Sequence, residues 1–127
     1  MQLLLDTHTL LWFYSGDDAL SDNLKKIIRT PTNTCYISIA SLWEITIKIS
    51  LGKLEINTPM AELFSFLDRN QFLVIPIELN HLLQLQRLQQ HHRDPFDRLI
   101  IAQALSENLP VATKDSFFSQ YGLTILW

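Results

Sequence analysis

The stretch Met1-Gln2-Leu3-Leu4-Leu5-Asp6-Thr7 decides the fold. Its three consecutive leucines do not alternate with polar residues, which is typical of a strand buried on both faces, as in a parallel sheet covered by helices. The run stops at Asp6, ahead of a helix-like segment over 8–14. Open α/β sheets place their sites at the carboxyl ends of such strands. Asp6 is therefore either a site residue, which must be hydrogen-bonded, paired or metal-bound, or the N-cap of the next helix.

Composition indicates a single compact, soluble domain over residues 1–127, because 47% of the chain is hydrophobic and supplies enough apolar material for a core. No apolar run approaches the ~18–20 residues that span a membrane, and the N-terminus lacks the basic region and cleavage site of a signal peptide. The single cysteine, Cys35, lies in an apolar run and is expected to fill the core. We therefore expect a cytoplasmic protein.

The formal net charge of −3 argues weakly against a protein that coats nucleic acid by electrostatic attraction. If four of the acids were neutralised in a metal site, however, the remainder of the chain would be mildly positive. The charge therefore does not exclude a nucleic-acid substrate. The three glycines are too few for a Gly-rich phosphate-binding loop.

Strand-like and helix-like segments alternate along the chain, without repeats, low-complexity segments or a linker. Apolar, β-prone runs predict further strands over 34–37, 72–77, 109–113 and 123–127. Helical spacing and capping signals predict further helices after an N-cap at Ser21, after an N-cap at Thr58, over 78–90, and from Asp94-Pro95 to about Asn108. Such alternation favours βαβ units and a parallel sheet. The predicted fold class is α/β.

Residues 38–51 are ambiguous between a strand and a helix. Apolar residues alternate with polar ones from Trp43 onward, which is the period of a strand. The length of the segment and Gly52 just beyond it favour a helix. In a strand, Glu44 would share a solvent face with Lys48, whereas in a helix it would lie one turn before Lys48 and pair with it. Periodicity alone does not decide between the two.

Three further acids stand where a helix begins or a strand ends. Asp94 precedes a proline, which is the pattern of a helix N-cap, and Asp97 lies in the first turn of that helix, in line with its apolar face. The carboxylate of Asp97 needs a partner, either in a site or on the backbone of residue 94, in the acid version of a capping box. Asp115 follows the run 109–113, so it would either share a sheet edge with Asp6 or cap the turn that follows.

Carboxylates that converge at one sheet edge cannot all ionise without raised pKa values unless a cation holds them. Oxygen ligands without cysteine or clustered histidine suit Mg²⁺ or Mn²⁺. Such ions lower the pKa of a water and neutralise charge on a scissile phosphate. No single acid is specific, but together they point to metal-assisted chemistry at a phosphate ester.

Four motifs occur in a family's order and approximate spacing: Leu3-Leu4-Leu5-Asp6-Thr7-His8, Ser38-Ile39-Ala40-Ser41-Leu42-Trp43-Glu44-Ile45, His92-Arg93-Asp94-Pro95-Phe96-Asp97-Arg98-Leu99-Ile100-Ile101-Ala102-Gln103-Ala104 and Pro110-Val111-Ala112-Thr113-Lys114-Asp115. With them the chain resembles a PIN domain and, more narrowly, the VapC toxins of bacterial type II toxin–antitoxin pairs. The resemblance covers essentially the whole chain, and the run over 93–98 is its most specific part.

The resemblance implies a PIN-like fold, a roughly five-stranded parallel sheet flanked by helices on both sides, and an endoribonuclease that depends on Mg²⁺ or Mn²⁺. It implies that the acids which act in catalysis and hold the metal are Asp6, Glu44, Asp97 and Asp115. Residues 38–51 would then form a helix that carries Glu44. The resemblance further implies an RNA substrate, a homodimer and a cognate VapB-type antitoxin that blocks the site.

Five further residues are candidates for supporting roles in such a site. Thr7 follows the first acid, and Thr113 would help to hold water or metal near the fourth. Asp94 would either assist the third acid or only cap its helix. Arg93 and Arg98 would either touch RNA phosphates or pair with neighbouring acids.

Two other functions fit part of the sequence. A phosphatase of the haloacid dehalogenase type also places an acid after its first strand, but it needs a second Asp two residues later, where this chain has His8. A PIN-like module that binds RNA or a protein without cutting would have no need of all four acids. The four histidines lack a regular metal spacing and are expected at the surface or in packing.

Overall fold

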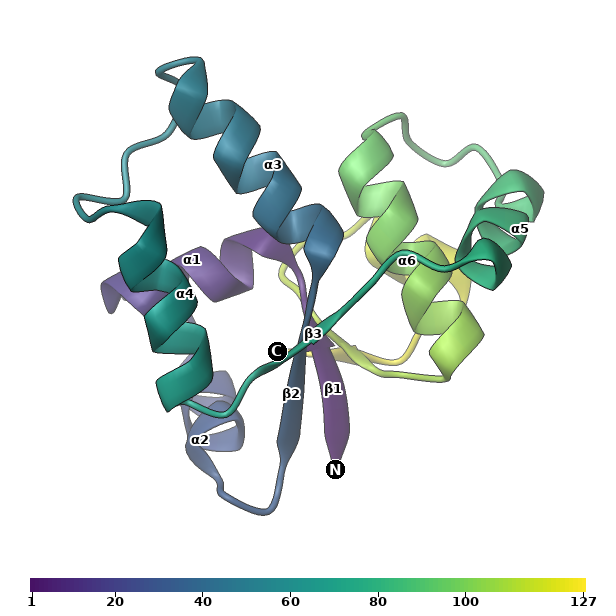
Figure 1. Ribbon diagram of the computed structural model, residues 1–127. Coiled ribbons are helices and arrows are strands. Elements are labelled where there is room, and N and C mark those ends of the chain that lie inside the picture. Colours follow the sequence, from purple (N-terminus) through teal and green to yellow (C-terminus); the bar gives the residue numbers. More distant parts are fainter.

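A five-stranded sheet forms the centre of the computed structural model, which describes residues 1–127 (Figure 1). Its strands are β1 (Gln2–Leu5), β2 (Thr34–Ser38), β3 (Leu73–Ile75), β4 (Val111–Ala112) and β5 (Ile125–Leu126). They lie in the order β3-β2-β1-β4-β5, and every neighbouring pair is parallel. The leucine run is therefore the central strand, and the predicted parallel α/β class is confirmed.

Helices cover both faces of this sheet. They are α1 (Thr7–Ser15), α2 (Asp22–Arg29), α3 (Ile39–Ser50), α4 (Met60–Arg69), α5 (Leu79–Arg87) and α6 (Pro95–Glu107), with a 3-10 turn η1 (Phe118–Tyr121) before β5. In Figure 1, α1, α2 and α4 lie on one side of the sheet and α5 and α6 on the other. None of the helices combines the length and apolar character that crossing a bilayer requires.

The leucines of β1 show how the two faces are filled. Leu3 and Leu5 belong to the core cluster formed with α1, α2, α3 and α4, whereas Leu4 belongs to the cluster formed with α6. All three side chains are completely buried. Because successive side chains of a strand point to opposite faces, an unbroken apolar run is what a sheet covered on both sides requires.

The ambiguous segment is the helix α3, as the family resemblance implied. Its N-cap is Ser38, whose side chain accepts the backbone N–H of Ala40. The strand-like alternation does not mark one buried face, because Ile45 is fully buried while Trp43 is 55% exposed. The helix places Glu44 one turn before Lys48, and the two side chains form the expected ion pair.

Some predicted boundaries are wrong. Helix α4 begins one residue later than expected, with Pro59 at the N-cap and no capping side chain. The hydroxyl of Thr58, the predicted cap, instead lies 2.6 Å from that of Tyr14 in α1. The last two strands are also shorter than predicted, because β4 and β5 pair over only two residues each.

Candidate active site

The strand order brings the predicted site residues to one edge of the sheet. Leu5 at the end of β1 pairs with Ile37 of β2 and with Ala112 of β4. The residues that follow these three strands therefore meet at the carboxyl edge, where sites of open α/β sheets lie. Helix α3 begins directly after β2, and α6 packs against α3.

Asp6 combines both roles considered for it. Its Oδ1 accepts the backbone N–H of Thr9 at 2.8 Å, which caps α1, and its Oδ2 accepts the hydroxyl of Thr113 at 2.5 Å. The side chain is almost completely buried, and this burial raises the pKa of Asp6, while the two hydrogen bonds oppose the rise. Asp6 is thus a buried carboxyl whose two oxygens are both satisfied from within the fold.

Glu44 is held in a similar way on α3. It is buried, its Oε1 accepts the hydroxyl of Thr7 at 2.8 Å, and its Oε2 accepts from the Lys48 ammonium at 2.7 Å. Thr7 Oγ1 also lies 2.9 Å from the hydroxyl of Ser41. The hydrogen bond that Lys48 donates to Glu44 raises the pKa of Lys48. Thr7 therefore supports the second acid rather than the first, which it follows in sequence.

Asp97 has a different environment, in the first turn of α6. Burial raises its pKa to about 7, and the charges of Asp94, Glu44, Asp6 and Asp115 add to the rise. Its carboxylate accepts no hydrogen bond, so the predicted reach-back bond to residue 94 is absent; instead Asp94 accepts the backbone N–H of Asp97 at 3.0 Å. The charges of Asp6, Glu44 and Asp115 thus act on Asp97, after burial and Asp94, in raising its pKa.

The remaining two acids act as caps. Asp94 Oδ1 accepts the backbone N–H groups of Phe96 and Asp97, which makes it the N-cap of α6. Asp115 Oδ1 accepts the N–H of Phe117 at 2.9 Å, and its own N–H donates to the hydroxyl of Thr113 at 3.0 Å. Each keeps one carboxylate oxygen that accepts no hydrogen bond.

No three acid, histidine or cysteine side chains stand arranged around a single point where they would hold a metal ion. The physical reason is that Asp6 and Glu44 turn all their oxygens toward donors of the fold. The donor set nevertheless fits a hard cation, because it consists of carboxylate and hydroxyl oxygens. Burial and then the charges of the neighbouring acids also raise the pKa of Asp97, which a bound cation would lower. Asp97 and Asp115, which keep free oxygens, would make the first contact with such an ion.

The two arginines that flank the third acid differ sharply. Arg98 is buried, and its guanidinium donates to the backbone carbonyls of Gln89 and Leu88 and to the hydroxyl of Tyr121. It forms no ion pair in this structure, and its guanidinium is occupied by the carbonyls of the loop before α6. Of the two arginines, only Arg93 is exposed and unpaired, and so available to a substrate.

One residue of this region was expected only at the surface or in packing. His92 Nε2 lies 3.8 Å from Asp97 Oδ2, and the His92 side chain is only 8% exposed. The sequence signal that would have singled it out is its place at the head of the acid-containing run over 92–98.

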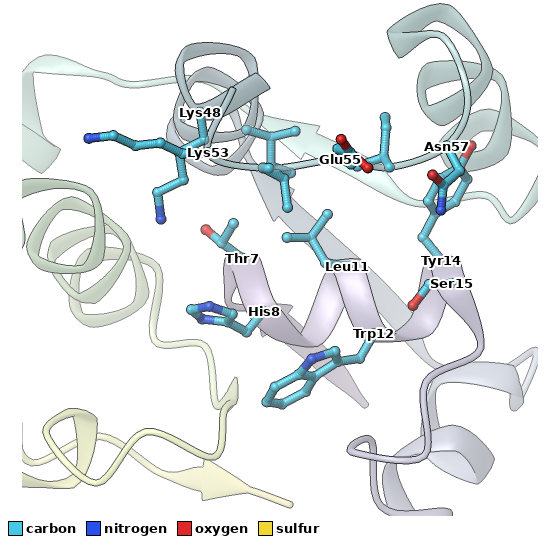
Figure 2. A pocket seen from close by; sticks show the side chains of 13 residues that line it. Thr7, His8, Leu11, Trp12, Tyr14, Ser15, Lys48, Lys53, Glu55 and Asn57 are labelled. Carbon is cyan, nitrogen blue, oxygen red and sulfur yellow. The ribbon is translucent and has the colours of Figure 1, made fainter. Parts of the chain in front are cut away.

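A cavity of about 330 Å³ opens between α1 and the segment that follows α3, and none of the four acids lines it. Figure 2 shows Lys48 and Lys53 on one side of this cavity and His8 and Trp12 of α1 on the other. Thr7, the residue that holds Glu44, also lines it. Lys48 is bound to Glu44, whereas Lys53 is exposed and forms no ion pair. Lys53 shares this cavity with Glu55. Asp6 and Asp115 instead line a separate hollow of about 250 Å³, together with His8, Trp12 and Lys114.

The sequence matches the family model of the PIN domain over residues 3–123. The chain belongs to the PIN domain family. Among curated proteins, no sequence matches it.

Solved structures share this PIN fold over their whole length. A chain of VapBC2 from Rickettsia felis, bound to a DNA fragment from its promoter, matches with a TM-score of 0.77 and 21% identity, over 100% of this chain and 99% of that one. DNA-bound VapBC from Salmonella typhimurium gives 0.76 and 18%, over 99% and 97%. VapC20 from Mycobacterium tuberculosis, described as a toxin that cleaves the sarcin-ricin loop, gives 0.70 and 14%, over 96% of both chains. At these identities the likeness shows a common fold.

Proposed function

We propose that this PIN domain is an endoribonuclease that depends on Mg²⁺ or Mn²⁺ and acts as the VapC-type toxin of a toxin–antitoxin pair. The observation that carries the proposal is the placement of four acids around the carboxyl edge of the sheet, where burial and then the charges of Asp94, Glu44, Asp6 and Asp115 raise the pKa of Asp97 to about 7. A fold that only needed stability would not retain such repulsion. The likeness of the fold to a toxin that cleaves the sarcin-ricin loop supports the same reading.

In the proposed reaction the chain supplies a preformed acidic site and a basic approach to it. Thr113 and Thr7 keep Asp6 and Glu44 in fixed positions, while Asp97 and Asp115 offer oxygens to a cation. When bound, the cation would lower the pKa of a water and neutralise charge on the scissile phosphate. Lys53 and Arg93, which are both exposed and unpaired, would contact phosphates on either side of the bond that is cut.

The proposed partners follow from the same assignment. A VapB-type antitoxin would bind this chain and block its site, and two copies of the chain would form a homodimer in the cytoplasm. Support comes from exposed apolar side chains on β3, α4 and α5, which include Phe64, Leu73, Val74, Leu82 and Leu83. Light scattering of the purified chain, alone and after coexpression with the product of an adjacent small reading frame, measures both assemblies.

The test of the activity is cleavage of mixed bacterial RNA by purified, antitoxin-free protein, first with Mg²⁺ or Mn²⁺ and then with EDTA. The expected result is cleavage at a few discrete positions that EDTA abolishes. An Asp97→Asn variant purified in the same way controls for contaminating ribonucleases. If folded wild-type protein cuts nothing with either metal, the proposal fails, and the alternative of an RNA- or protein-binding PIN-like module takes its place.

A further inference from the structure

Two unsatisfied polar groups face each other at the edge of the acidic site. His92 Nε2 is the one buried side-chain nitrogen or oxygen in the chain without a hydrogen-bond partner. Asp97 is the one acid of the site whose carboxylate accepts no hydrogen bond; the other four accept at least one each. The Nε2 and Oδ2 atoms of these two residues are 3.8 Å apart. A buried group without a partner is rare in a native fold and needs an explanation.

Contacts other than Asp97 fix the ring of His92. It stacks on the ring of Phe117, with centroids 5.2 Å apart and an angle of 10° between the planes. Its Nδ1 lies 2.8 Å from the hydroxyl oxygen of Tyr121. The backbone N–H of His92 and the guanidinium of Arg98 both donate to that same oxygen, each at 3.3 Å. The ring is thus held from one side and from its face, with Nε2 directed toward Asp97.

This network also determines which ring nitrogen carries the proton. A backbone N–H and a guanidinium can only donate, so they occupy the acceptor positions of the Tyr121 oxygen. The hydroxyl hydrogen of Tyr121 is then left to donate to His92 Nδ1, which must accept it. In a neutral imidazole the proton therefore lies on Nε2. The nitrogen that faces Asp97 is a donor.

We propose that His92 is a positioning residue that donates from Nε2 to the carboxylate of Asp97, with Tyr121 and Arg98 fixing its tautomer. A hydrogen bond of about 2.9 Å requires a movement of roughly 1 Å, and no other hydrogen bond holds the Asp97 carboxylate back. The inference rests on the proposed function, because the carboxylate of Asp97 that His92 orients would bind the cation. Outer hydrogen bonds of this kind orient metal ligands and are worth about 10–100-fold in metal affinity. Two other acids of the site already accept such a hydrogen bond, because Thr113 donates to Asp6 and Thr7 donates to Glu44.

The first test is the tautomer of His92 in metal-free protein. Long-range ¹H–¹⁵N spectra of protein labelled with ¹⁵N-histidine at pH 8, assigned with a His92→Gln variant, should show the Nε2–H tautomer. Tyr121→Phe removes the hydroxyl donor but keeps the ring, so it should shift the population toward Nδ1–H. An Nδ1–H tautomer in the wild-type protein, or no change in Tyr121→Phe, would overturn the proposal.

The second test measures Mn²⁺ affinity by calorimetry. His92→Phe keeps a ring against Phe117 but has no donor, so we expect Mn²⁺ binding to weaken by about 10–100-fold. His92→Gln places an amide N–H near the Nε2 position and should stay within about threefold of wild type. Asp68→Asn, which removes an exposed acid of α4 that forms no ion pair, is the control. Equal affinity of the Phe and wild-type proteins refutes the positioning role.

These measurements separate the inference from the proposed function. Wild-type protein that binds no Mn²⁺ would overturn the proposed function, while the tautomer spectra would still decide whether His92 donates toward Asp97. Thermal unfolding of each variant identifies any that fails to fold. If His92→Phe does not fold, Tyr121→Phe takes its place, with weaker Mn²⁺ binding as the expected result and unchanged binding as the refutation.

Discussion

Asp6 and Asp97 are two acids of the same site, and the fold treats them in opposite ways. Both have a raised pKa, and in both burial is the main cause. At Asp6 two hydrogen bonds oppose the rise, so the ionised carboxylate is supported from within. At Asp97 four neighbouring acids add to the rise, and no hydrogen bond opposes it. The comparison indicates that Asp6 belongs to the framework of the site. Asp97, in contrast, is the position where a bound cation would offset the cost of burial and of like-charge repulsion.

The strand ends that carry Asp6 and Asp115 differ from the helix start that carries Asp97 in the same way. The end of β1 is tied to the end of β4, because the hydroxyl of Thr113 donates to Asp6 and that of Thr9 donates to the carbonyl of Ala112. The start of α6 has only its cap, Asp94, whose negative charge also acts on Asp97. A destabilised residue held in place by a stable scaffold is the usual arrangement where binding and stability compete.

The largest effect that follows from this difference is on cleavage. Asp97→Asn keeps the size of the side chain but removes its charge, so we expect RNA cleavage to fall by roughly 10³-fold or more, with the fold intact by circular dichroism. Asp68→Asn, an exposed acid on α4 without an ion pair, is the matched control and should cut like wild type. Full activity of Asp97→Asn would remove Asp97 from the site.

A second experiment weakens the framework instead. Thr113 is buried, and its hydroxyl donates to Asp6 and accepts from the N–H of Asp115. Thr113→Val leaves both groups without this partner, so we expect the free energy of unfolding to fall by about 2 kcal/mol. Thr113→Ser keeps the hydroxyl and should lose much less. Urea unfolding of the three proteins measures this, and equal losses in Val and Ser would show that the methyl group, not the hydrogen bond, matters.

Charge at Asp97 should make the metal-free protein less stable as pH rises. The pKa of Asp97 is about 7 in the fold against 3.8 for the free group. Between these values the unfolded chain releases a proton that the folded chain keeps, so stability falls from pH 4 to pH 7 and then levels off.

Asp97→Asn removes this slope. It should stabilise the metal-free protein by about 1.5 kcal/mol at pH 8 and by little at pH 4.5. Urea unfolding at the two pH values gives the comparison. A gain of equal size at both pH values would mean that the charge of Asp97 is not its source.

Short stretches of the sequence predict many of the strands, helices and caps around the site, whereas the other features depend on residues far apart in the chain. The leucine run predicts the central strand, and Ser21 and Asp94 are the caps that their positions indicated. Thr58 fails as a cap because a tyrosine 44 positions away engages its hydroxyl. The helix that carries Glu44 followed from the family resemblance and not from periodicity, because its apolar residues do not form one buried face.

The contacts of His92 lie further beyond what a local pattern can show. They depend on Tyr121, which is 29 positions away and on the turn before β5. Neither the run that contains His92 nor the spacing of the histidines contains this information. The contacts of Arg98 could not be predicted for the same reason, since its carbonyl partners precede it by six, nine and ten positions in a loop without a pattern.

The smallest expected effect separates the two roles of Asp94. As a cap it accepts two backbone N–H groups through Oδ1, and as a charge it raises the pKa of Asp97. Asn caps helices about as well as Asp, so Asp94→Asn should keep stability and cleavage, whereas Asp94→Ala should lose about 1 kcal/mol in urea unfolding at pH 8. If Asp94→Asn cuts RNA poorly although it is as stable as wild type, the free oxygen of Asp94 takes part in the site. Asp94 would then join Asp97 as an acid that acts on the ligand, and it would not serve the framework alone.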